Sequence, residues 1–347
     1  MQEPITAQFK PITVAIDAMG GDLAPQAVIT GALDAARGLP DIQVVLVGDE
    51  AIVRPLMAQG NPPANLTIRH ASQVIDMCDA PSAAIRQKRD SSIAVGMRMV
   101  RDGEAHAFVS AGNSGAMMAA ATLVLKLQPG IDRPAIAAPF PTKTGYLVML
   151  DAGATMDCKP SNLLQFAHMG NAYARAVMER PLPRIGLLSV GEEPTKGDEL
   201  TKDTHALLKT SGLNFVGNVE PKEMARGEVD VVVCDGFVGN LMLKAGEAYG
   251  SMPMELIKTT LSQTLLRRLA AALLRPAFRE VKKQFDYSQY GGALLLGVNG
   301  IVVIGHGRST HFAIENAIRL GARAAAHGLV APVTSNGAPT DSRGAES

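Results

Sequence analysis

The feature that most constrains the fold is a regular alternation of short apolar runs with segments long enough to form helices. Such an alternation predicts βαβ units, an α/β fold and a mainly parallel sheet that helices cover on both faces. We expect strands at Thr13–Asp17, Ile42–Gly48, Leu66–His70, Ala105–Ser110, Ala135–Pro139, Tyr146–Asp151, Ile185–Val190, Asn214–Gly217, Val229–Cys234 and Ile301–Gly305. We expect helices near Pro25–Gly38, Ser82–Arg101, Ser114–Leu127, Pro160–Glu179, Gly197–Ser211, Gly239–Ala248 and Thr310–His327, and a flexible turn around Gly291–Gly297.

Length and composition indicate a globular chain with one large core. The 347 residues are 47% hydrophobic and 19% charged, which is ample apolar material. We expect a single α/β domain over residues 10–330 and a disordered tail over residues 331–347, which are rich in Pro, Gly, Ser and Ala. Lys plus Arg balance Asp plus Glu at 33 each, so the whole chain has no net field that would attract nucleic acid.

The cysteines and the N-terminus favour a cytoplasmic protein. Cys78, Cys158 and Cys234 form no CxxC pair, and each lies in or beside an apolar run. This pattern predicts reduced, buried thiols rather than disulfides or structural zinc. The N-terminal residues contain no apolar signal-peptide core, and no run of eighteen apolar residues is present to span a membrane.

The turn DAMGGD at residues 17–22 follows the first expected strand. Gly20 and Gly21 let the backbone turn sharply and approach a ligand closely. Asp17 and Asp22 either hold the loop or bind a metal ion, and we favour the loop. The turn is not GxGxxG, which argues against a dinucleotide site.

The turn SAGNSGA at residues 110–116 lies between an expected strand and an apolar helix. Small residues expose backbone N–H groups, and a helix N-terminus carries partial positive charge, so this turn predicts a phosphate-binding site. Helix capping by Asn113 or Ser114 is the structural alternative and is compatible with it. The candidate binding residues are Ser110, Gly112, Asn113, Ser114 and Gly115.

Two further turns carry groups suited to stabilising negative charge. GEEPTKG at residues 191–197 contains Lys196, which Glu192 and Glu193 precede in the sequence. The two glutamates either fix the lysine or pair with other residues. CDGFVGN at residues 234–240 presents a polar amide at a helix start. The candidate residues of this second turn are Asp235, Gly236, Gly239 and Asn240.

Asp151 and His306 lie at two other expected strand ends. Asp151 either orients a neighbouring group or forms a turn. His306, in HGRS at residues 306–309, either exchanges a proton near neutral pH or is a structural hydrogen-bonding residue, and we favour a role in the site. Because the carboxyl ends of parallel strands share one edge of a sheet, we expect these turns to line that edge.

Residues 252–285 have the pattern of an amphipathic helical hairpin, with seven basic residues against two acidic ones. We expect Arg275-Pro276 to divide it into two helices. A basic amphipathic hairpin predicts binding to a membrane surface or to an acidic protein, whereas a dimer interface is the structural alternative. Its apolar residues recur three or four positions apart, at Met254, Ile257, Leu261, Leu265, Leu269 and Leu273.

These turns suit a reaction that needs no enzyme nucleophile. The sequence contains no nucleophile elbow, no Walker A loop and no metal-ligand cluster. Inorganic phosphate is itself a nucleophile, and its attack on an acyl thioester requires positioning and stabilisation of the oxyanion that develops. Lys196 would supply positive charge there, and Asn240 a further hydrogen-bond donor.

Six turns in this order closely resemble the bacterial phosphate acyltransferase family over residues 10 to 330: DAMGGD, SAGNSGA, GEEPTKG, CDGFVGN, YGGALLLG and HGRS. The resemblance implies reversible transfer of a fatty acyl group from acyl-[acyl-carrier-protein] to inorganic phosphate, giving acyl phosphate for phospholipid synthesis. It implies a three-layer α/β/α fold similar to isocitrate and isopropylmalate dehydrogenases, a homodimer, and no cofactor. It also implies that Lys196 and Asn240 match the family's active-site lysine and asparagine.

One position departs from the family pattern. The family motif DxGAN reads DAGAT at residues 151–155, so Thr155 keeps a hydroxyl but lacks the amide.

The resemblance also implies a place at the inner face of the cell membrane. There the family passes acyl phosphate to a membrane-bound glycerol-3-phosphate acyltransferase, which suits a basic hairpin. Acyl carrier protein is strongly acidic, so the same hairpin is also a candidate docking surface for the substrate.

Two other functions fit parts of the sequence. One is an NAD-dependent, metal-assisted dehydrogenase on the same fold, with magnesium on Asp17 or Asp235. The other is a membrane-surface scaffold built on the hairpin.

Overall fold

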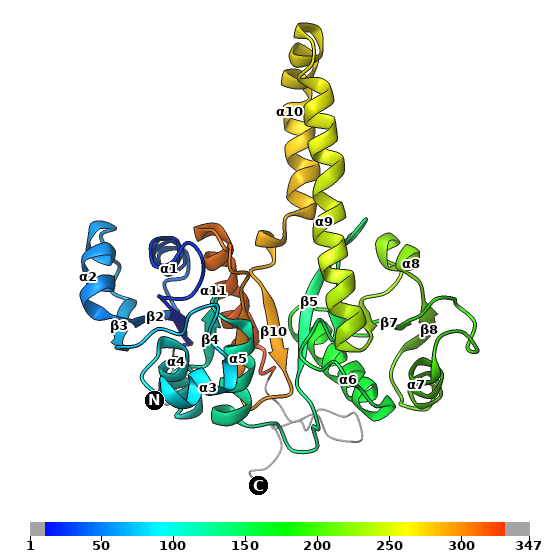
Figure 1. Ribbon diagram of the computed structural model, residues 1–347, viewed down its shortest axis with the longest axis horizontal. Helices are drawn as coiled ribbons and strands as arrows, with labels where there is room; N and C mark the ends of the chain where they lie inside the picture. Colours follow the sequence, from blue (N-terminus) through cyan, green and yellow to red (C-terminus); the bar gives the residue numbers. More distant parts are fainter. Residues whose placement is uncertain (1–10, 330–347) are drawn as a thin grey trace, which may run out of the picture. The chain divides into compact units, whose positions relative to one another are not determined.

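A computed structural model describes residues 11–329, without the side chains at 251, 254, 282–285 and 287. The chain divides into two compact units (Figure 1). Unit 1 contains residues 11–125 and Gly300–Ala326, and unit 2 contains Lys126–Asn299. The expectation of a single domain stays a prediction, and the expected tail at residues 331–347 lies outside the described residues.

Unit 1 is built on a parallel sheet. Its strands are β1 (Thr13–Asp17), β2 (Gln43–Gly48), β3 (Leu66–His70), β4 (Ala107–Ser110) and β11 (Ile301–Ile304), in the order β3-β2-β1-β4-β11. The register pairs Asp17 with Val47 and Ile304 with Ser110, so the strands finish together at one edge. The α-helices of this unit are α1 (Gln26–Gly38), α2 (Glu50–Gln59), α3 (Pro81–Gln87), α4 (Ser92–Arg101), α5 (Ser114–Ala120) and α11 (His311–Ala326). Helices α1, α2 and α11 cover one face and α3, α4 and α5 the other (Figure 1).

Unit 2 has a mixed sheet. Its strands are β5 (Ala135–Thr142), β6 (Gly145–Leu150), β7 (Ile185–Leu188), β8 (Phe215–Val219), β9 (Val231–Val233) and β10 (Ala293–Leu296), in the order β10-β5-β6-β9-β7-β8. Strand β5 is antiparallel to both of its neighbours, whereas β6, β9, β7 and β8 are parallel. The α-helices are α6 (Pro160–Ala176), α7 (Glu199–Lys209), α8 (Pro221–Arg226), α9 (Gly236–Leu261) and α10 (Leu265–Phe285).

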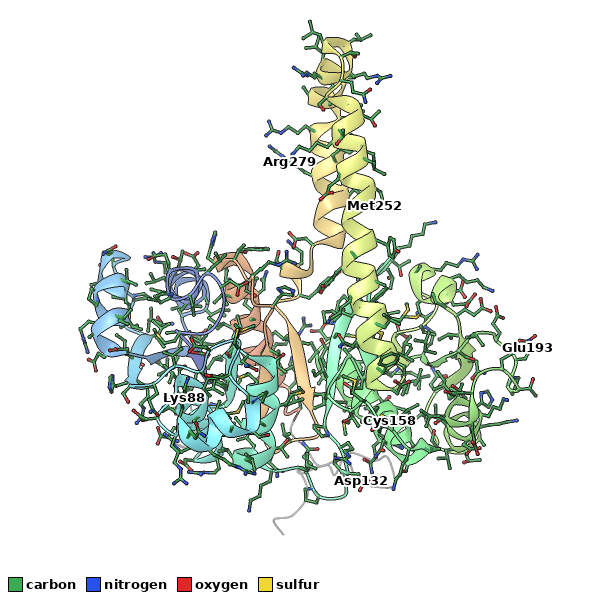
Figure 2. All side chains as sticks on the ribbon, in the orientation of Figure 1. Lys88, Asp132, Cys158, Glu193, Met252 and Arg279 are labelled. Atoms are coloured by element: carbon green, nitrogen blue, oxygen red, sulfur yellow. The ribbon has the colours of Figure 1, made fainter. Side chains whose placement is uncertain are left out.

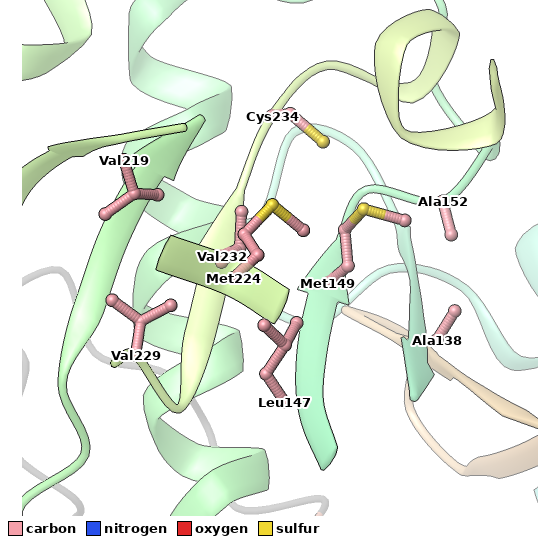
Figure 3. Packing of buried hydrophobic residues seen from close by; sticks show 9 residues of the cluster. All are labelled: Ala138, Leu147, Met149, Ala152, Val219, Met224, Val229, Val232 and Cys234. Carbon is pink, nitrogen blue, oxygen red and sulfur yellow. The ribbon is translucent and has the colours of Figure 1, made fainter. Parts of the chain in front are cut away.

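One core cluster of unit 2 shows why these strands form where they do (Figure 3). Leu147 and Met149 are two residues apart along β6, so their side chains point to the same face of the sheet. Val232 of β9 and Met224 of α8 pack with them, and all four side chains are fully buried. Burying a side chain of this size contributes about 1.5–3 kcal/mol, so this face anchors the parallel strands whose ends carry the candidate site.

All ten expected strands are present, but one further strand was missed. The apolar run ALLL forms β10, antiparallel to β5, where we expected a flexible turn. Gly292 and Gly297 have φ of 142° and 85° and confine the turns to the two ends of this strand. Burial of the leucines between the glycines stabilises the strand by more than the flexibility of the glycines disfavours it.

The helix expected at Ser82–Arg101 is two helices, α3 and α4. The chain breaks between them because Ser91 caps α4 and Lys88 turns back to donate to the Val74 carbonyl at 2.9 Å. Helices α2 and α8 were not predicted. Cys78 is exposed, contrary to the expectation that the thiols are buried, because it lies in the loop between β3 and α3.

The hairpin is present, but its turn lies elsewhere than expected. Helix α9 runs through Pro253 to Leu261, and Pro276 lies inside α10. The turn at residues 262–264 is made by polar side chains: the Ser262 hydroxyl donates to the Thr259 carbonyl at 2.8 Å, and Thr264 accepts the Arg267 N–H at 3.3 Å. The two helices run side by side and extend beyond the rest of unit 2 (Figure 1). Within residues 11–329, no helix combines the length and hydropathy that crossing a membrane requires.

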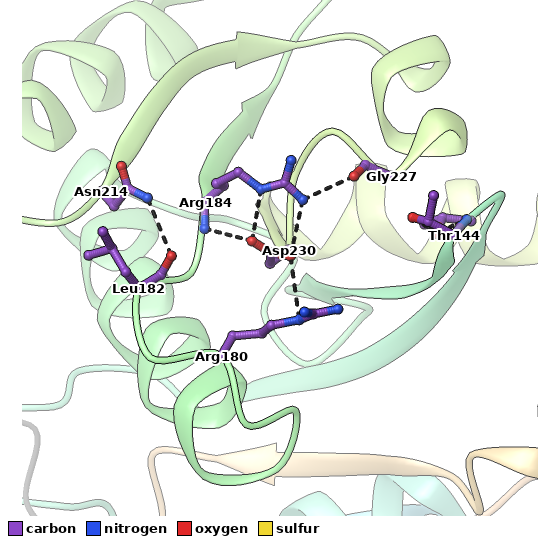
Figure 4. Close-up of polar contacts among 8 residues, drawn as sticks. Thr144, Arg180, Leu182, Arg184, Asn214, Gly227 and Asp230 are labelled. Carbon is purple, nitrogen blue, oxygen red and sulfur yellow. Dashed lines mark hydrogen bonds and ion pairs between the residues drawn. The ribbon is translucent and has the colours of Figure 1, made fainter.

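Asp230 ties the start of β7 to the loop before β9 (Figure 4). Its carboxylate accepts hydrogen bonds from the Arg184 backbone N–H at 2.9 Å and from the guanidinium at 3.0 and 3.2 Å. Burial acts to raise the pKa of Asp230, but the bonds from Arg184 and the nearby Arg180 outweigh it, and the pKa lies below the usual value. A lowered pKa means that this stabilisation is present at neutral pH and is lost as pH falls through the folded-state pKa.

We expect Asp230→Ala to lower the free energy of unfolding at pH 7 by about 2–3 kcal/mol, because it removes the acceptor of three hydrogen bonds. The variant should also lose less stability than the wild type when pH falls below 3.8, the usual value for this carboxyl. Urea unfolding at pH 7 and at a pH below 3.8 measures the two effects. Asp203→Ala, at an exposed carboxylate of α7, is the control. An unchanged urea midpoint at pH 7 in Asp230→Ala would contradict this account.

Candidate functional site

Asp151 builds a tight turn at the end of β6. The carboxylate is fully buried and accepts four backbone N–H groups, from Ile136 at 2.8 Å, Gly153 and Ala154 at 3.0 Å and Thr155 at 2.6 Å. Burial raises the pKa of Asp151, and the four N–H donors act against that shift. Of the two roles we considered, the structure therefore gives Asp151 that of a turn-former.

Thr155 connects this turn to the start of α9. Its hydroxyl donates to the Pro134 carbonyl at 3.0 Å, and its own carbonyl accepts the Gly236 N–H at 2.9 Å. A Cβ at Gly236 would lie 2.6 Å from the Asp151 carboxylate, and one at Gly239 would collide with the Asp151 carbonyl oxygen. Close packing thus explains why both positions are glycine. The Thr155 hydroxyl stabilises the turn by donating to the Pro134 carbonyl.

Asn240 is held at the first turn of α9, beside the Asp151 turn. Asp235 caps this helix by accepting the N–H groups of Phe237 at 2.9 Å and Val238 at 3.0 Å. A Cβ at Gly153 would lie 3.3 Å from the Asn240 side chain, so the two residues are neighbours. Within the described part of the chain, the half-buried amide of Asn240 has no hydrogen-bond partner. It is therefore available to a ligand.

Lys196 lies on the exposed loop between β7 and α7. Its backbone N–H donates to the Glu193 carbonyl at 3.0 Å, whereas its ammonium has no carboxylate partner among the described residues. Glu192 pairs with Lys222 of α8 at 3.1 Å. Glu192 therefore pairs elsewhere, which was one of our two expectations. Glu193, which is labelled in Figure 2, constrains the backbone of the lysine because its carbonyl accepts the Lys196 N–H.

The two cysteines of unit 2 are protonated thiols at neutral pH. Burial raises the pKa of Cys158, which is labelled in Figure 2, to about 11. Its Sγ donates to the Thr155 carbonyl at 3.3 Å. Burial also raises the pKa of Cys234 well above its usual value. Because the thiolate is the reactive form of cysteine, neither residue is poised as a nucleophile.

In unit 1, Asp17 holds the end of β1 against the end of β4. Its buried carboxylate accepts the Ser110 hydroxyl at 2.7 Å, and the Ser110 oxygen accepts the Gly112 N–H at 3.0 Å. Burial raises the pKa of Asp17, against the lowering effect of its hydrogen bonds, first among them those from Ser92 and Ser110. Asp17 thus holds the loop, and Ser110 has no hydroxyl proton left for a ligand.

Asn113 is also engaged inside unit 1. Its Oδ1 caps α5 by accepting the Ala116 N–H at 3.0 Å, and its Nδ2 lies 3.1–3.2 Å from the carbonyls of Asp76, Met77 and Asp79. The capping role therefore holds for Asn113. Ser114 is exposed at the first position of α5 and retains its hydroxyl for a ligand.

The turn at residues 17–22 contacts two other turns of unit 1, those at residues 306–309 and 110–116. The Asp22 N–H donates to the Gly307 carbonyl at 2.8 Å, and a Cβ at Gly20 would lie 2.9 Å from the Gly112 nitrogen. His306 Nδ1 accepts the Arg308 N–H at 3.2 Å, which leaves the proton of the neutral ring on Nε2. Gly21 shares this turn, with φ of 112°. Residues 11–329 contain no group of three or more His, Cys, Asp or Glu that is able to hold a metal ion.

The candidate residues thus lie at the carboxyl ends of parallel strands in each unit. In unit 2 they follow β6, β9 and β7, which are neighbours in the sheet. Sequence reasoning missed Asn218 of β8, which donates to the Glu193 carbonyl of the lysine loop, and His205 of α7, which contacts Asn218. The expected strand ended at Gly217, one residue before Asn218, so no sequence signal marked Asn218 as part of the site.

Comparisons with known proteins decide the family. Residues 12–331 match the model of a family described as fatty acid synthesis protein. The chain is 52% identical over 307 residues to the phosphate acyltransferase of Geotalea uraniireducens, covering 88% of each chain. The chain belongs to the phosphate acyltransferase family. It is also 48% identical over 317 residues to the family member from Moorella thermoacetica, covering 91% of this chain and 93% of that one.

Family membership makes the chain an acyltransferase of lipid biosynthesis. The dehydrogenase and scaffold alternatives therefore do not describe it. The fold resembles that of the EutD phosphotransacetylase from Staphylococcus aureus, with a TM-score of 0.59 and 14% identity over 91% of this chain and 94% of that one. It also resembles a branched-chain phosphotransacylase from Enterococcus faecalis, with a TM-score of 0.57 and 14% identity over 91% of this chain and 99% of that one. These likenesses confirm the α/β class with a mainly parallel sheet.

Proposed function

We propose that the chain transfers a fatty acyl group from acyl-[acyl-carrier-protein] to inorganic phosphate, giving acyl phosphate for phospholipid synthesis. One observation carries the proposal. In unit 2, the loop after β7 presents Lys196, whose ammonium has no carboxylate partner within the described residues. The start of α9, which follows the neighbouring strand β9, presents Asn240, whose amide has no hydrogen-bond partner within the same residues. These are groups that stabilise an oxyanion. The thiols of the same unit are held protonated and are not poised as nucleophiles, which supports inorganic phosphate as the attacking group.

The proposed step balances without a further reactant. An oxygen of hydrogen phosphate attacks the thioester carbonyl carbon, a C–O bond forms, and negative charge moves onto the carbonyl oxygen. Lys196 and Asn240 stabilise that charge. The intermediate then collapses with cleavage of the C–S bond, and the proton that phosphate carried ends on the departing thiol of the carrier.

The turn at residues 110–116 is our proposed phosphate-binding site of unit 1. Ser114 is its most accessible donor, because the Ser110 hydroxyl and the Asn113 amide already have partners inside the unit. Gly112 and Gly115 supply the small side-chain-free positions that such a turn needs. His306 lies at the same edge of unit 1, and we propose that it takes part in the site there.

An assay with purified protein tests the function. Acyl-[acyl-carrier-protein] is incubated with and without inorganic phosphate, free carrier thiol is measured, and acyl phosphate is trapped as the hydroxamate. We expect both products to form in equal amounts and only when phosphate is present. Thiol release without phosphate, or no hydroxamate with it, would refute the proposed reaction.

We also propose that the α9–α10 hairpin is the surface by which the enzyme meets a membrane or its acidic carrier. Helix α10 exposes large apolar side chains among basic residues, and the exposed fractions are 78% at Leu266, 59% at Leu269 and 83% at Leu273. Each such residue contributes about 1.5–3 kcal/mol when it is buried in lipid. Leu261 is half-buried, so it is a poorer choice for a test than the sequence pattern suggested.

We expect the triple change Leu266→Glu, Leu269→Glu and Leu273→Glu to abolish co-sedimentation with anionic liposomes while acyl transfer from dissolved carrier continues. Leu182→Glu, at a 72% exposed leucine outside the hairpin, is the control. Undiminished liposome binding by the triple variant would contradict the membrane proposal. Loss of the dimer instead would identify the hairpin as a subunit interface, and a raised KM for the carrier as the carrier-docking surface.

A further inference from the structure

A buried asparagine holds the loop that carries Lys196. Asn218 lies on β8 and is 5% exposed. Its Nδ2 donates to the Glu193 carbonyl oxygen at 2.9 Å, and the same oxygen accepts the Lys196 N–H at 3.0 Å. The Glu193 carbonyl therefore links Asn218 to the Lys196 backbone through two hydrogen bonds.

His205 of α7 fixes the direction of the Asn218 amide. His205 Nδ1 lies 2.9 Å from Asn218 Oδ1, and the ring packs edge-on against Phe215 with centroids 5.1 Å apart. A carbonyl oxygen only accepts, so Nδ1 is the donor in this bond. With Oδ1 occupied by His205, the NH₂ group of Asn218 faces Glu193.

The other anchor of the loop is weak. Glu192 pairs with Lys222, but their side chains are 60% and 51% exposed, and exposed ion pairs of this kind contribute little. Asn218 itself is buried, and a buried amide left without a hydrogen-bond partner is costly. Asn218 is therefore the contact that determines where the turn from Glu193 to Lys196 lies.

We propose that Asn218, oriented by His205, is a positioning residue for acyl transfer, because it sets the place of Lys196. This inference rests on the role given to Lys196 in the proposed function. A reacting or stabilising group that moves by about 1 Å is able to cost a hundredfold in rate, so loss of the anchor should appear in turnover.

Asn218→Asp is the sharpest test. The variant keeps the shape and the oxygen that accepts from His205, but replaces the NH₂ that donates to Glu193 by an oxygen. We expect kcat to fall by roughly tenfold to a hundredfold with a much smaller change in KM. We also expect deuterium exchange at residues 191–197 to become several-fold faster.

Asn214→Asp is the matched control. Asn214 precedes β8 and its Nδ2 lies 3.5 Å from the Leu182 carbonyl, away from the lysine loop. The same chemical change there should leave both kcat and exchange at residues 191–197 as in the wild type. Equal losses of kcat in the two variants would overturn the positioning role.

Substitutions at His205 test the same role without changing Asn218. His205→Asn retains an N–H donor near the position of Nδ1, whereas His205→Leu removes it. We expect His205→Leu to reproduce the fall in kcat and the faster exchange. We expect His205→Asn to retain most of the wild-type kcat and most of the wild-type protection from exchange.

The outcomes separate this inference from the proposed function. If Lys196→Ala loses turnover but Asn218→Asp and His205→Leu do not, the positioning role is wrong and the proposed function stands. If Lys196→Ala retains turnover, the role given to Lys196 is wrong, and so is the positioning role of Asn218.

Discussion

Lys196→Ala is expected to lower the rate of acyl phosphate formation by roughly a hundredfold, the cost of about 3 kcal/mol for a lost group that stabilises an oxyanion. The ammonium has no carboxylate partner among the described residues, so its charge is not neutralised within the protein. The side chain is exposed, and its removal should change the free energy of unfolding by less than about 0.5 kcal/mol. The measurement is kcat with acyl-[acyl-carrier-protein] and saturating phosphate.

Two comparisons make the result specific to position 196. Lys196→Arg keeps a positive charge with a different shape and should lie between the wild type and Lys196→Ala. Lys209→Ala, at an exposed lysine in the last turn of α7, should have wild-type turnover. Turnover by Lys196→Ala within twofold of the wild type would remove the lysine from the mechanism.

Asn240→Ala is expected to have the second large effect, also of the order of a hundredfold in kcat. The amide is held at the start of α9 by the packing of Gly236 and Gly239 on the Asp151 turn, so it is positioned before substrate binds. Because the amide has no partner among the described residues, its removal leaves no buried group unsatisfied. Activity should therefore be lost without a matching loss of stability.

Asn240→Asp separates donation from shape. The aspartate has the same size but presents oxygens to a negatively charged transition state, so it should be at least as slow as Asn240→Ala. Glu247→Ala, two turns further along α9 and exposed, is the control. Asn240→Asp with near-normal turnover would show that the amide does not donate to the oxyanion.

The strand prediction succeeded where burial and β-propensity point the same way. Strand β1 has the expected bounds because it is a short buried apolar run that ends in a turn. Strand β3 also has the expected bounds, although only Leu66 of its five residues is buried. Strand β10 was missed because its flanking glycines were given more weight than the leucines between them. The hairpin turn was misplaced because Pro276 was expected to end a helix, whereas local hydrogen bonds of Ser262 and Thr264 decide the turn.

The candidate site was predicted as positions at strand ends, but not as contacts. The sequence showed that Asp151 ends a strand, yet one of its four donors, Ile136, comes from another strand. The choice between orienting a group and forming a turn therefore required the fold. The anchor at Asn218 was hidden for the same reason, since it reaches the lysine loop from β8 across the sheet.

The central claim is that phosphate attacks the thioester directly, with no acyl-enzyme. The most direct test is exchange of isotopically labelled free carrier into unlabelled acyl-[acyl-carrier-protein]. An acyl-enzyme would allow this exchange without phosphate, whereas direct attack requires phosphate to form acyl phosphate first, from which the reverse reaction returns label. We predict no exchange above the uncatalysed rate without phosphate and clear exchange once phosphate is added. Enzyme-dependent exchange in the complete absence of phosphate would contradict the account.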